Sequence, residues 1–138
     1  MIQRMQSLWL LLASFAALLT FHYPFYSGLR TGTPGNQLVY LNASSNMLVT
    51  VFTSVLVLGG LVTIFLYKNR RRQLGASIAL LLLALLDLVI YFSMTKQYTG
   101  GTFSLTALLA LAIPLFLLLA ARGIWKDERL VKSLDRLR

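Results

Sequence analysis

The fold is decided by residues 74–94, which read LGASIALLLLALLDLVIYFSM. An α-helix rises about 1.5 Å per residue, so about 20 apolar residues are enough to cross the roughly 30 Å hydrocarbon core of a bilayer. Within this stretch Asp87 is the one residue of the Asp, Glu, Lys, Arg and His types. The stretch therefore predicts a membrane-spanning helix.

Three further stretches of the same kind predict an all-α integral membrane protein with four transmembrane helices. They cover approximately residues 5–23, 47–67 and 103–121. Because lipid offers the backbone no hydrogen-bond partners, each stretch is expected to be helical despite its Val and Ile content. We keep the first stretch as a helix of the mature protein, because no small-residue cleavage site follows it. Residues 1–138 are then a single membrane domain.

The charge of the chain predicts its orientation. The 138 residues are 57% hydrophobic and 12% charged, yet the formal net charge is +9. Of the thirteen Lys and Arg residues, eleven fall on one side of the four predicted helices, and only Arg30 and Lys96 fall on the other. The positive-inside rule therefore places both termini in the cytoplasm and the 24–46 loop outside. Nucleic-acid binding is not indicated, because no recognition motif accompanies the charge.

The connections predict which helices are neighbours. The short link between the second and third helices makes them adjacent and antiparallel. Gly100 and Gly101 predict a turn between the third and fourth helices. In the 24–46 loop, residues 37–41 alternate as in a short strand, and residues 33–36 (TPGN) predict the turn of a hairpin. No internal repeat is present, so an inverted-repeat transporter is not indicated.

Asp87 is the sharpest candidate for a polar site inside the membrane. An acid near the bilayer centre costs at least ~2.5 kcal/mol on insertion scales, so its presence there suggests a role. Matching the depths of the helices makes Thr20, Thr53 and Ser54 its possible partners. Two interpretations stay open. The favoured one is a hydrogen-bonded acid that locks the bundle or contacts another subunit, and the other is a carrier of protons or cations.

Two basic segments are candidates for binding. The first connects the second and third helices, and it is interpreted as a topology signal that also meets anionic lipid headgroups, through Lys68, Arg70, Arg71 and Arg72. The second is the tail, residues 122–138, in which leucines at 130, 134 and 137 predict an amphipathic basic cytoplasmic helix. The tail residues expected to dock on a partner are Trp125, Lys126, Arg129, Leu130, Leu134 and Arg136.

The sequence lacks the residues that most enzyme chemistries need. It has no cysteine, which excludes disulfides and cysteine-ligated metals, and its single histidine, His22, is interpreted as an interfacial side chain. No hydrolase, metalloprotease or phosphate-loop motif occurs. We therefore expect no catalytic residues, no cofactor and no metal site.

Both ends of the chain resemble a known family. Residues 1–13 (MIQRMQSLWLLLA) and the tail, residues 122–138 (RGIWKDERLVKSLDRLR), are similar to the domain of unknown function 4293 family of small integral membrane proteins from Gram-negative bacteria. The resemblance implies a four-helix protein of the inner membrane. It transfers no reaction and no catalytic residue.

These observations lead to a ranked set of functions. The first is a non-catalytic accessory or assembly subunit that contacts a larger inner-membrane complex, with the anionic bilayer and another membrane protein as partners. The alternative is a small oligomeric transporter or channel that uses Asp87. A third interpretation is a membrane enzyme whose site is completed by a substrate or a partner.

Overall fold

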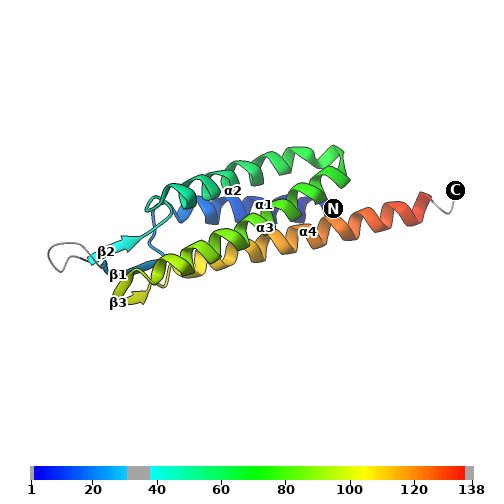
Figure 1. Cartoon of the computed structure of the whole chain (residues 1–138). Coiled ribbons are helices and arrows are strands. Elements are labelled where there is room, and N and C mark those ends of the chain that lie inside the picture. The colour runs from blue at the N-terminus through cyan, green and yellow to red at the C-terminus, as the bar shows by residue number, and fades with distance from the viewer. Residues whose placement is uncertain (1, 31–37, 136–138) are drawn as a thin grey trace.

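The computed structural model describes residues 2–30 and 38–135, with side chains over 5–29 and 38–131. Four helices lie side by side in a long bundle, and three strands form a small sheet at one end (Figure 1). The helices are α1 (Ile2–Leu19), α2 (Met47–Phe65), α3 (Arg70–Thr95) and α4 (Ala107–Asp135), with a short 3-10 turn, η1 (Leu66–Lys68), between α2 and α3. The strands are β1 (Tyr26–Arg30), β2 (Leu38–Leu41) and β3 (Tyr98–Phe103).

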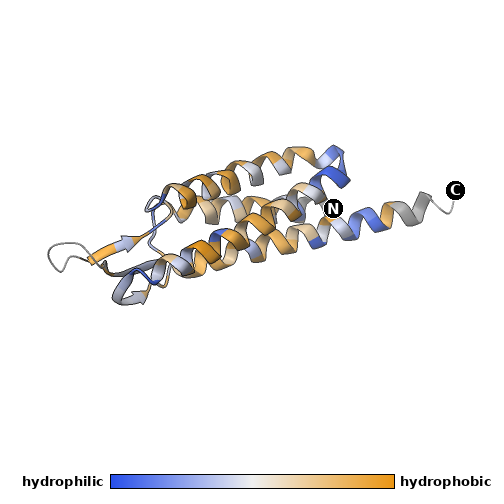
Figure 2. Ribbon diagram, in the orientation of Figure 1, coloured by the Kyte–Doolittle hydropathy of each residue, from blue (hydrophilic) through white to orange (hydrophobic). Residues whose placement is uncertain are grey.

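The helices have the length and composition of membrane spans. Among the described residues, three helical segments are long and apolar enough to cross a membrane, and they are Met47–Lys68, Arg70–Thr95 and Ala107–Val131. The apolar part of α1, Met5–Leu19, is shorter. Hydrophobic residues cover the bundle along most of its length, and hydrophilic residues gather at its two ends (Figure 2). The predicted class, a helical protein suited to a membrane, is confirmed at this level.

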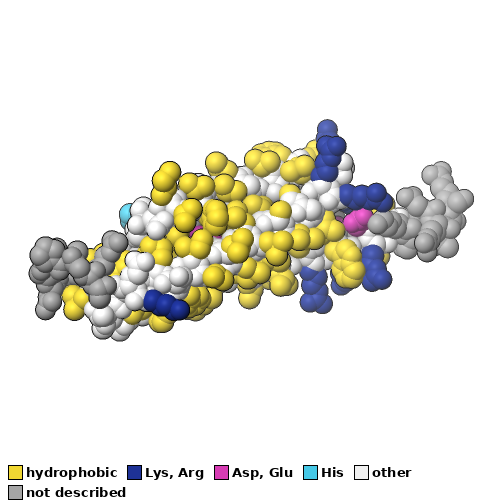
Figure 3. Space-filling view, viewed as in Figure 1, with side chains coloured by type: hydrophobic (Ala, Val, Ile, Leu, Met, Phe, Trp, Pro, Cys, Tyr) yellow, Lys and Arg dark blue, Asp and Glu magenta, His cyan; other side chains and the backbone are white. Residues whose placement is uncertain are grey.

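The two ends of the bundle differ in charge. We call the end that carries the strands the sheet end, and the opposite end, with the α2–α3 connection and the last turns of α4, the basic end. Lys and Arg side chains cluster at the basic end (Figure 3). Those described there are Lys68, Arg70, Arg71, Arg72, Arg122, Lys126 and Arg129, whereas Lys96 lies near the sheet end. Both described chain ends also lie toward the basic end (Figure 1).

Two predicted helix boundaries are wrong at the sheet end. The first helix was expected to reach residue 23, but α1 ends at Leu19, and the next hydroxyl, Thr20 Oγ1, donates back to the carbonyl of Ala17 at 2.7 Å. The fourth was expected to begin at residue 103, but α4 begins at Ala107. Pro24 is the physical reason for part of this, since it cannot continue a helix and its carbonyl instead accepts a hydrogen bond from Thr106 Oγ1.

The sheet confirms one predicted strand and overturns one predicted turn. The strand expected at 37–41 is β2, which pairs antiparallel with β1. The expected turn at 33–36 lies outside the described residues. The turn expected between the third and fourth helices is wrong, because Tyr98–Phe103 forms β3 and pairs antiparallel with the other edge of β1, giving the order β2-β1-β3.

The two glycines of β3 serve the strand in different ways. Gly100 has a φ of +64°, a conformation that side chains disfavour. Gly101 lies against β1, where a Cβ atom would come within 2.6 Å of the carbonyl oxygen of Ser27. The glycine pair that predicts a turn is therefore used to bend one strand and to bring it close to its neighbour.

The bundle core is built from small residues facing large ones. α1 contributes Ala13, Ala16 and Ala17, which pack with Leu10 and Leu117 in the interior. Small side chains let helix backbones approach closely, which favours packing in a lipid environment. A second buried cluster lies at the sheet end and joins the strands to the helices through aromatic rings, among them Phe25, Tyr26, Tyr91 and Tyr98.

Candidate functional site

Asp87 lies in a buried polar cluster between the helices. It stands on α3 with 3% of its surface exposed, and it faces Thr53 of α2, which is fully buried. Thr53 Oγ1 donates a hydrogen bond to Asp87 Oδ2 at 3.2 Å. The depth-matching argument thus named a residue that the structure places in contact with the acid.

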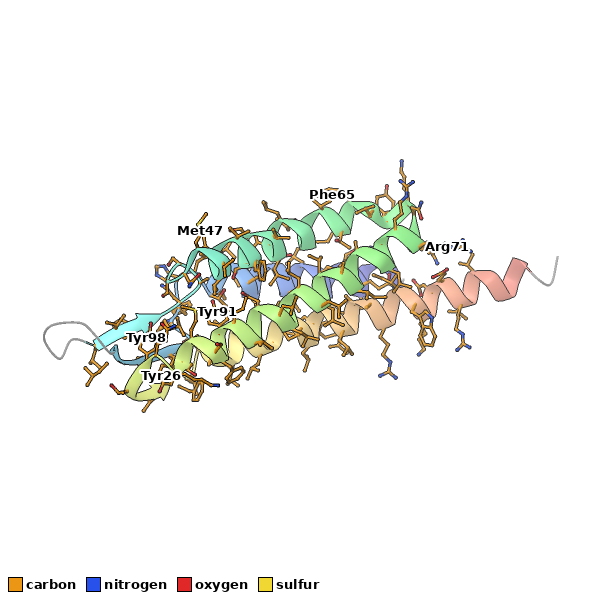
Figure 4. The ribbon with its side chains drawn as sticks, in the orientation of Figure 1. Tyr26, Met47, Phe65, Arg71, Tyr91 and Tyr98 are labelled. Carbon is orange, nitrogen blue, oxygen red and sulfur yellow. The ribbon has the colours of Figure 1, made fainter. Side chains whose placement is uncertain are left out.

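Tyr91 joins the same cluster from one turn further along α3. Its side chain is 1% exposed, and Asp87, Thr20 and Thr53 supply the polar surroundings of its hydroxyl. Neither this hydroxyl nor Asp87 Oδ1 has a hydrogen-bond partner among the described side chains and backbone groups. We call Thr20, Thr53, Asp87 and Tyr91 the sheet-end polar cluster. Figure 4 shows Tyr91 inside the molecule, near Tyr26 and Tyr98 of the sheet.

The other two predicted partners of Asp87 are placed differently. Thr20 lies just past the end of α1, is 5% exposed and donates to the carbonyl of Ala17. It belongs to the cluster through Tyr91 and not through Asp87. Ser54 does not join it, because its hydroxyl donates to the Thr50 carbonyl at 2.7 Å on the same helix. One residue along a helix is a rotation of about 100°, which is enough to turn Ser54 away from the face that holds Thr53.

Phe25 closes the sheet-end polar cluster on the side of the sheet. Its ring is 4% exposed, and its centroid lies 4.8 Å from that of Tyr91. On its other side Phe25 borders a cavity of about 600 Å³. That cavity is lined mainly by apolar residues of α3, β3 and α4, including Phe92, Phe103 and Leu108. Phe25 therefore lies between Tyr91 of the cluster and a cavity that opens at the surface.

A second buried polar contact lies at the basic end. Gln6 of α1 and Asp127 of α4 are 4% and 6% exposed, and Gln6 Nε2 donates to Asp127 Oδ2 at 2.7 Å. Gly123 makes room for it, since a Cβ atom there would lie 3.0 Å from Gln6 Cγ. We call this contact the Gln6–Asp127 pair. Sequence reasoning missed both residues.

A signal for Asp127 was nevertheless present in the sequence. The buried positions of α4 follow each other at spacings of three and four residues, and they are Ala107, Ala110, Ile113, Leu117, Ala120, Ile124 and Asp127. This is the periodicity of a helix face that packs inward. Asp127 continues the apolar face of the span, so its burial could have been inferred from its register.

The basic connection is tied to α4 by two arginines. Arg71 Nε lies 3.4 Å from Glu128 Oε1, and Arg70 Nη1 donates to the backbone carbonyl of Asp127 at 3.4 Å. The Arg71 side chain is 80% exposed, whereas that of Glu128 is 14% exposed. Arg72 and Lys68 of the same predicted segment are exposed.

The predicted docking tail is helical and partly exposed. α4 continues without a break past Gly123 to Asp135. Trp125 and Leu130 are 51% and 52% exposed, Lys126 and Arg129 are also exposed, and the Arg129 guanidinium lies 4.9 Å from the centre of the Trp125 ring. Of the remaining predicted docking residues, the Leu134 side chain and Arg136 lie outside the described residues.

The described residues offer buried acid and hydroxyl groups, and no group of three or more His, Cys, Asp or Glu side chains among them is arranged to hold a metal ion. Asp87 can exchange a proton with a neighbouring hydroxyl or water if one reaches it.

His22, at the sheet end, packs edge-on against Tyr23 with ring centroids 5.6 Å apart.

Comparison with known proteins gives one result. No curated protein and no solved structure matches the chain. A family model described as "Domain of unknown function (DUF4293)" matches residues 2–137, which is nearly the whole length. The chain therefore belongs to the DUF4293 family.

Proposed function

We propose that this chain is a non-catalytic accessory subunit of a larger complex in the bacterial inner membrane. In this proposal all four helices span the bilayer, and both termini are cytoplasmic. The clustering of Lys and Arg at the end that carries both described chain ends supports the orientation.

The span of α1 is supported by its contacts at both ends of the bundle. At the basic end, the Gln6 side chain donates a hydrogen bond to Asp127. At the sheet end, the backbone carbonyl of Thr20 accepts a hydrogen bond from the backbone N–H of Ala43. A helix of 18 residues is about 27 Å long at about 1.5 Å per residue, close to the thickness of a bilayer core. α1 therefore runs beside α2 and α4 over most of their apolar length.

The orientation is testable with single cysteines, because the chain contains none of its own. Ser44→Cys places a thiol at the exposed sheet end, and Lys126→Cys places one at the exposed basic end. A membrane-impermeant maleimide added to spheroplasts is expected to label the first variant, and to label the second only after permeabilisation. An epitope tag before Met1 should be protected like Lys126→Cys. A tag that is accessible from outside would contradict the four-span topology.

The observation that carries the accessory role is the exposed end of α4. Past the Gln6–Asp127 pair, α4 projects beyond the other helices (Figure 1). Leu130 and Val131 of this projecting part are exposed among basic residues, as is Trp125 just before the pair. Large apolar side chains beside positive charge are typical of surfaces that bind an amphipathic or acidic partner helix.

A photo-crosslinking residue at position 130 tests this role in cells. We expect a discrete adduct with another membrane protein, and no such adduct from a crosslinker at position 44, at the opposite end. Leu130→Asp should remove co-purification with that partner while leaving the chain inserted. Recovery of only lipid adducts from position 130 would contradict the accessory role.

A second candidate, a small transporter or channel, is favoured by the sheet-end polar cluster. The partnerless Asp87 Oδ1 and Tyr91 hydroxyl are positioned to hold a proton or a small polar guest. Proteoliposomes with the purified chain should then show proton-coupled flux that Asp87→Asn abolishes. Flux that is absent, or unchanged by the substitution, would contradict this candidate.

A further inference from the structure

A small pocket at the basic end brings three cationic side chains together. It has a volume of about 270 Å³ and is lined by Lys68, Asn69, Arg70, Arg71, Glu128 and Val131. We call it the basic pocket. At roughly 30 Å³ for each water molecule, this volume equals about nine waters, which gives space for a phosphate and part of its substituent.

The arginines of the basic pocket are held in place by α4. Arg71 Nε forms an ion pair with the Glu128 carboxylate, and Arg70 Nη1 donates a hydrogen bond to the backbone carbonyl of Asp127. A guanidinium has five N–H donors, so each arginine keeps donors available for a ligand. Figure 4 shows Arg71 at the α2–α3 connection on the side that faces α4.

The charge balance of the pocket favours an anion. Lys68, Arg70 and Arg71 face one carboxylate, that of Glu128, and no acidic residue lies in the first turn of α3. The first turn of a helix already carries partial positive charge. Three positive charges around this pocket against one carboxylate leave an excess that a phosphate would balance.

The pocket also adjoins the apolar surface of the bundle. Phe65 and Tyr67, 78% and 52% exposed, lie three residues and one residue before Lys68, and Val131 forms part of the pocket wall. Figure 4 shows Phe65 on the outer side of α2, near this connection. A ligand whose anionic group fills the pocket can thus place a hydrocarbon chain against Val131, which is 42% exposed.

We infer that the basic pocket binds the phosphodiester headgroup of an anionic phospholipid, with the acyl chains running along the apolar surface of the bundle next to Val131. The inference rests on the proposed span of the membrane and not on the accessory role. A soluble phosphate would match the charges of the pocket but would not use the apolar surface beside it.

Native mass spectrometry of the delipidated full-length chain tests the inference. We expect phosphatidylglycerol adducts to survive at collision energies that remove phosphatidylcholine, and inorganic phosphate to leave no adduct. Equal retention of both lipids would overturn the inference, because the headgroup charge would then not be recognised. Retention of inorganic phosphate alone would overturn it as well, because the site would then be one for soluble anions.

Asn69→Asp separates binding from folding. Asn69 caps α3 by accepting the N–H of Arg72 at 3.3 Å, and Asp is an equally good cap. The variant should therefore fold, but it places a negative charge in the pocket and should weaken phosphatidylglycerol binding about fivefold, the effect of about one charge near an anionic lipid surface. Unchanged binding would overturn the inference.

Asn46→Asp is the matched control at the other end of the molecule. Asn46 caps α2 in the same way, accepting from Leu48 at 2.9 Å. The substitution changes the net charge equally, and we expect phosphatidylglycerol binding to stay within error of the parent chain. If both variants lose binding to the same extent, net charge alone explains the affinity and the pocket does not.

A second pair tests the pocket lysine. Lys68→Gln and Lys126→Gln remove the same charge, but Lys68 lines the pocket and Lys126 does not. Loss of phosphatidylglycerol retention in Lys68→Gln and not in Lys126→Gln would support the site. The reverse result, or equal losses, would overturn it.

Discussion

Gln6, near the start of the first helix, donates a 2.7 Å hydrogen bond to the buried carboxylate of Asp127, 121 positions further along the chain. The contact fixes the register between α1 and α4, which form the first and last parts of the bundle. It lies at the basic end, where α4 leaves the other helices (Figure 1).

Gln6→Leu is expected to destabilise the bundle. The variant leaves the Asp127 carboxylate buried without its partner, which costs about 1–3 kcal/mol in the free energy of unfolding. Equilibrium unfolding of the purified protein in mixed micelles with increasing SDS, followed by circular dichroism, measures the loss. Asp127→Asn keeps an oxygen that Gln6 can donate to and should lose less. Equal stability of Gln6→Leu and the parent chain would show that the contact is not formed.

Two helix glycines should respond oppositely to alanine. Gly60→Ala places a Cβ against the Ser14 hydroxyl of α1, and we expect it to lower the free energy of unfolding by about 1–3 kcal/mol because it overpacks the α1–α2 contact. Gly75→Ala meets nothing within 4 Å and should raise it by up to about 1 kcal/mol, since alanine favours a helix more than glycine does. The same SDS titration compares the two. A similar response from both would contradict the close packing of α1 on α2.

Thr53→Val tests the hydrogen bond inside the sheet-end polar cluster. Valine has nearly the shape of threonine but cannot donate, so both oxygens of Asp87 would be left without partners. We expect a loss of about 1–3 kcal/mol in the free energy of unfolding. Thr53→Ser keeps the hydroxyl and should retain most of that stability. If Ser and Val substitutions cost the same, the methyl group and not the hydrogen bond matters at this position.

The neighbouring glycines of β3 should differ in their tolerance of asparagine. Gly100→Asn is expected to be accepted, because asparagine tolerates a positive φ and nothing lies within 4 Å. Gly101→Asn should separate β3 from β1, since its Cβ would come within 2.6 Å of the Ser27 carbonyl. Hydrogen exchange of the strand amides measures this, with faster exchange for Gly101→Asn only. Slow exchange in both variants would contradict the pairing of β1 with β3.

Hydropathy was sufficient to locate the helices, because the length of an apolar run is a local property of the sequence. It placed α2 to within two residues of its ends and the end of α3 to within one, but it missed the start of α3 by four residues. It did not find the ends of α1 and α4 at the sheet, where Pro24 and Thr106 form a contact between segments more than eighty positions apart. Such contacts leave no periodicity in either segment alone.

The sheet shows the same limit. β2 was predicted from its alternation, but β3 was not, because YTGGTF contains the glycine pair of a turn. The sequence also named Thr53 and Ser54 equally as partners of Asp87. The two residues are neighbours in the sequence, so they lie at nearly the same depth in the membrane. They point in directions about 100° apart around the helix, and matching depths cannot distinguish those directions.

The position of β3 also has a consequence for biogenesis. Thr99 Oγ1 donates to the carbonyl of Leu29, a residue synthesised seventy positions earlier. During translation β1 and β2 leave the ribosome first, and their sheet stays incomplete until α2 and α3 have followed. In a bilayer, β3 reaches β1 only if that hairpin of helices has crossed in the correct direction. Closure of the sheet therefore requires that α2 and α3 return the chain to the end of the bundle where β1 lies.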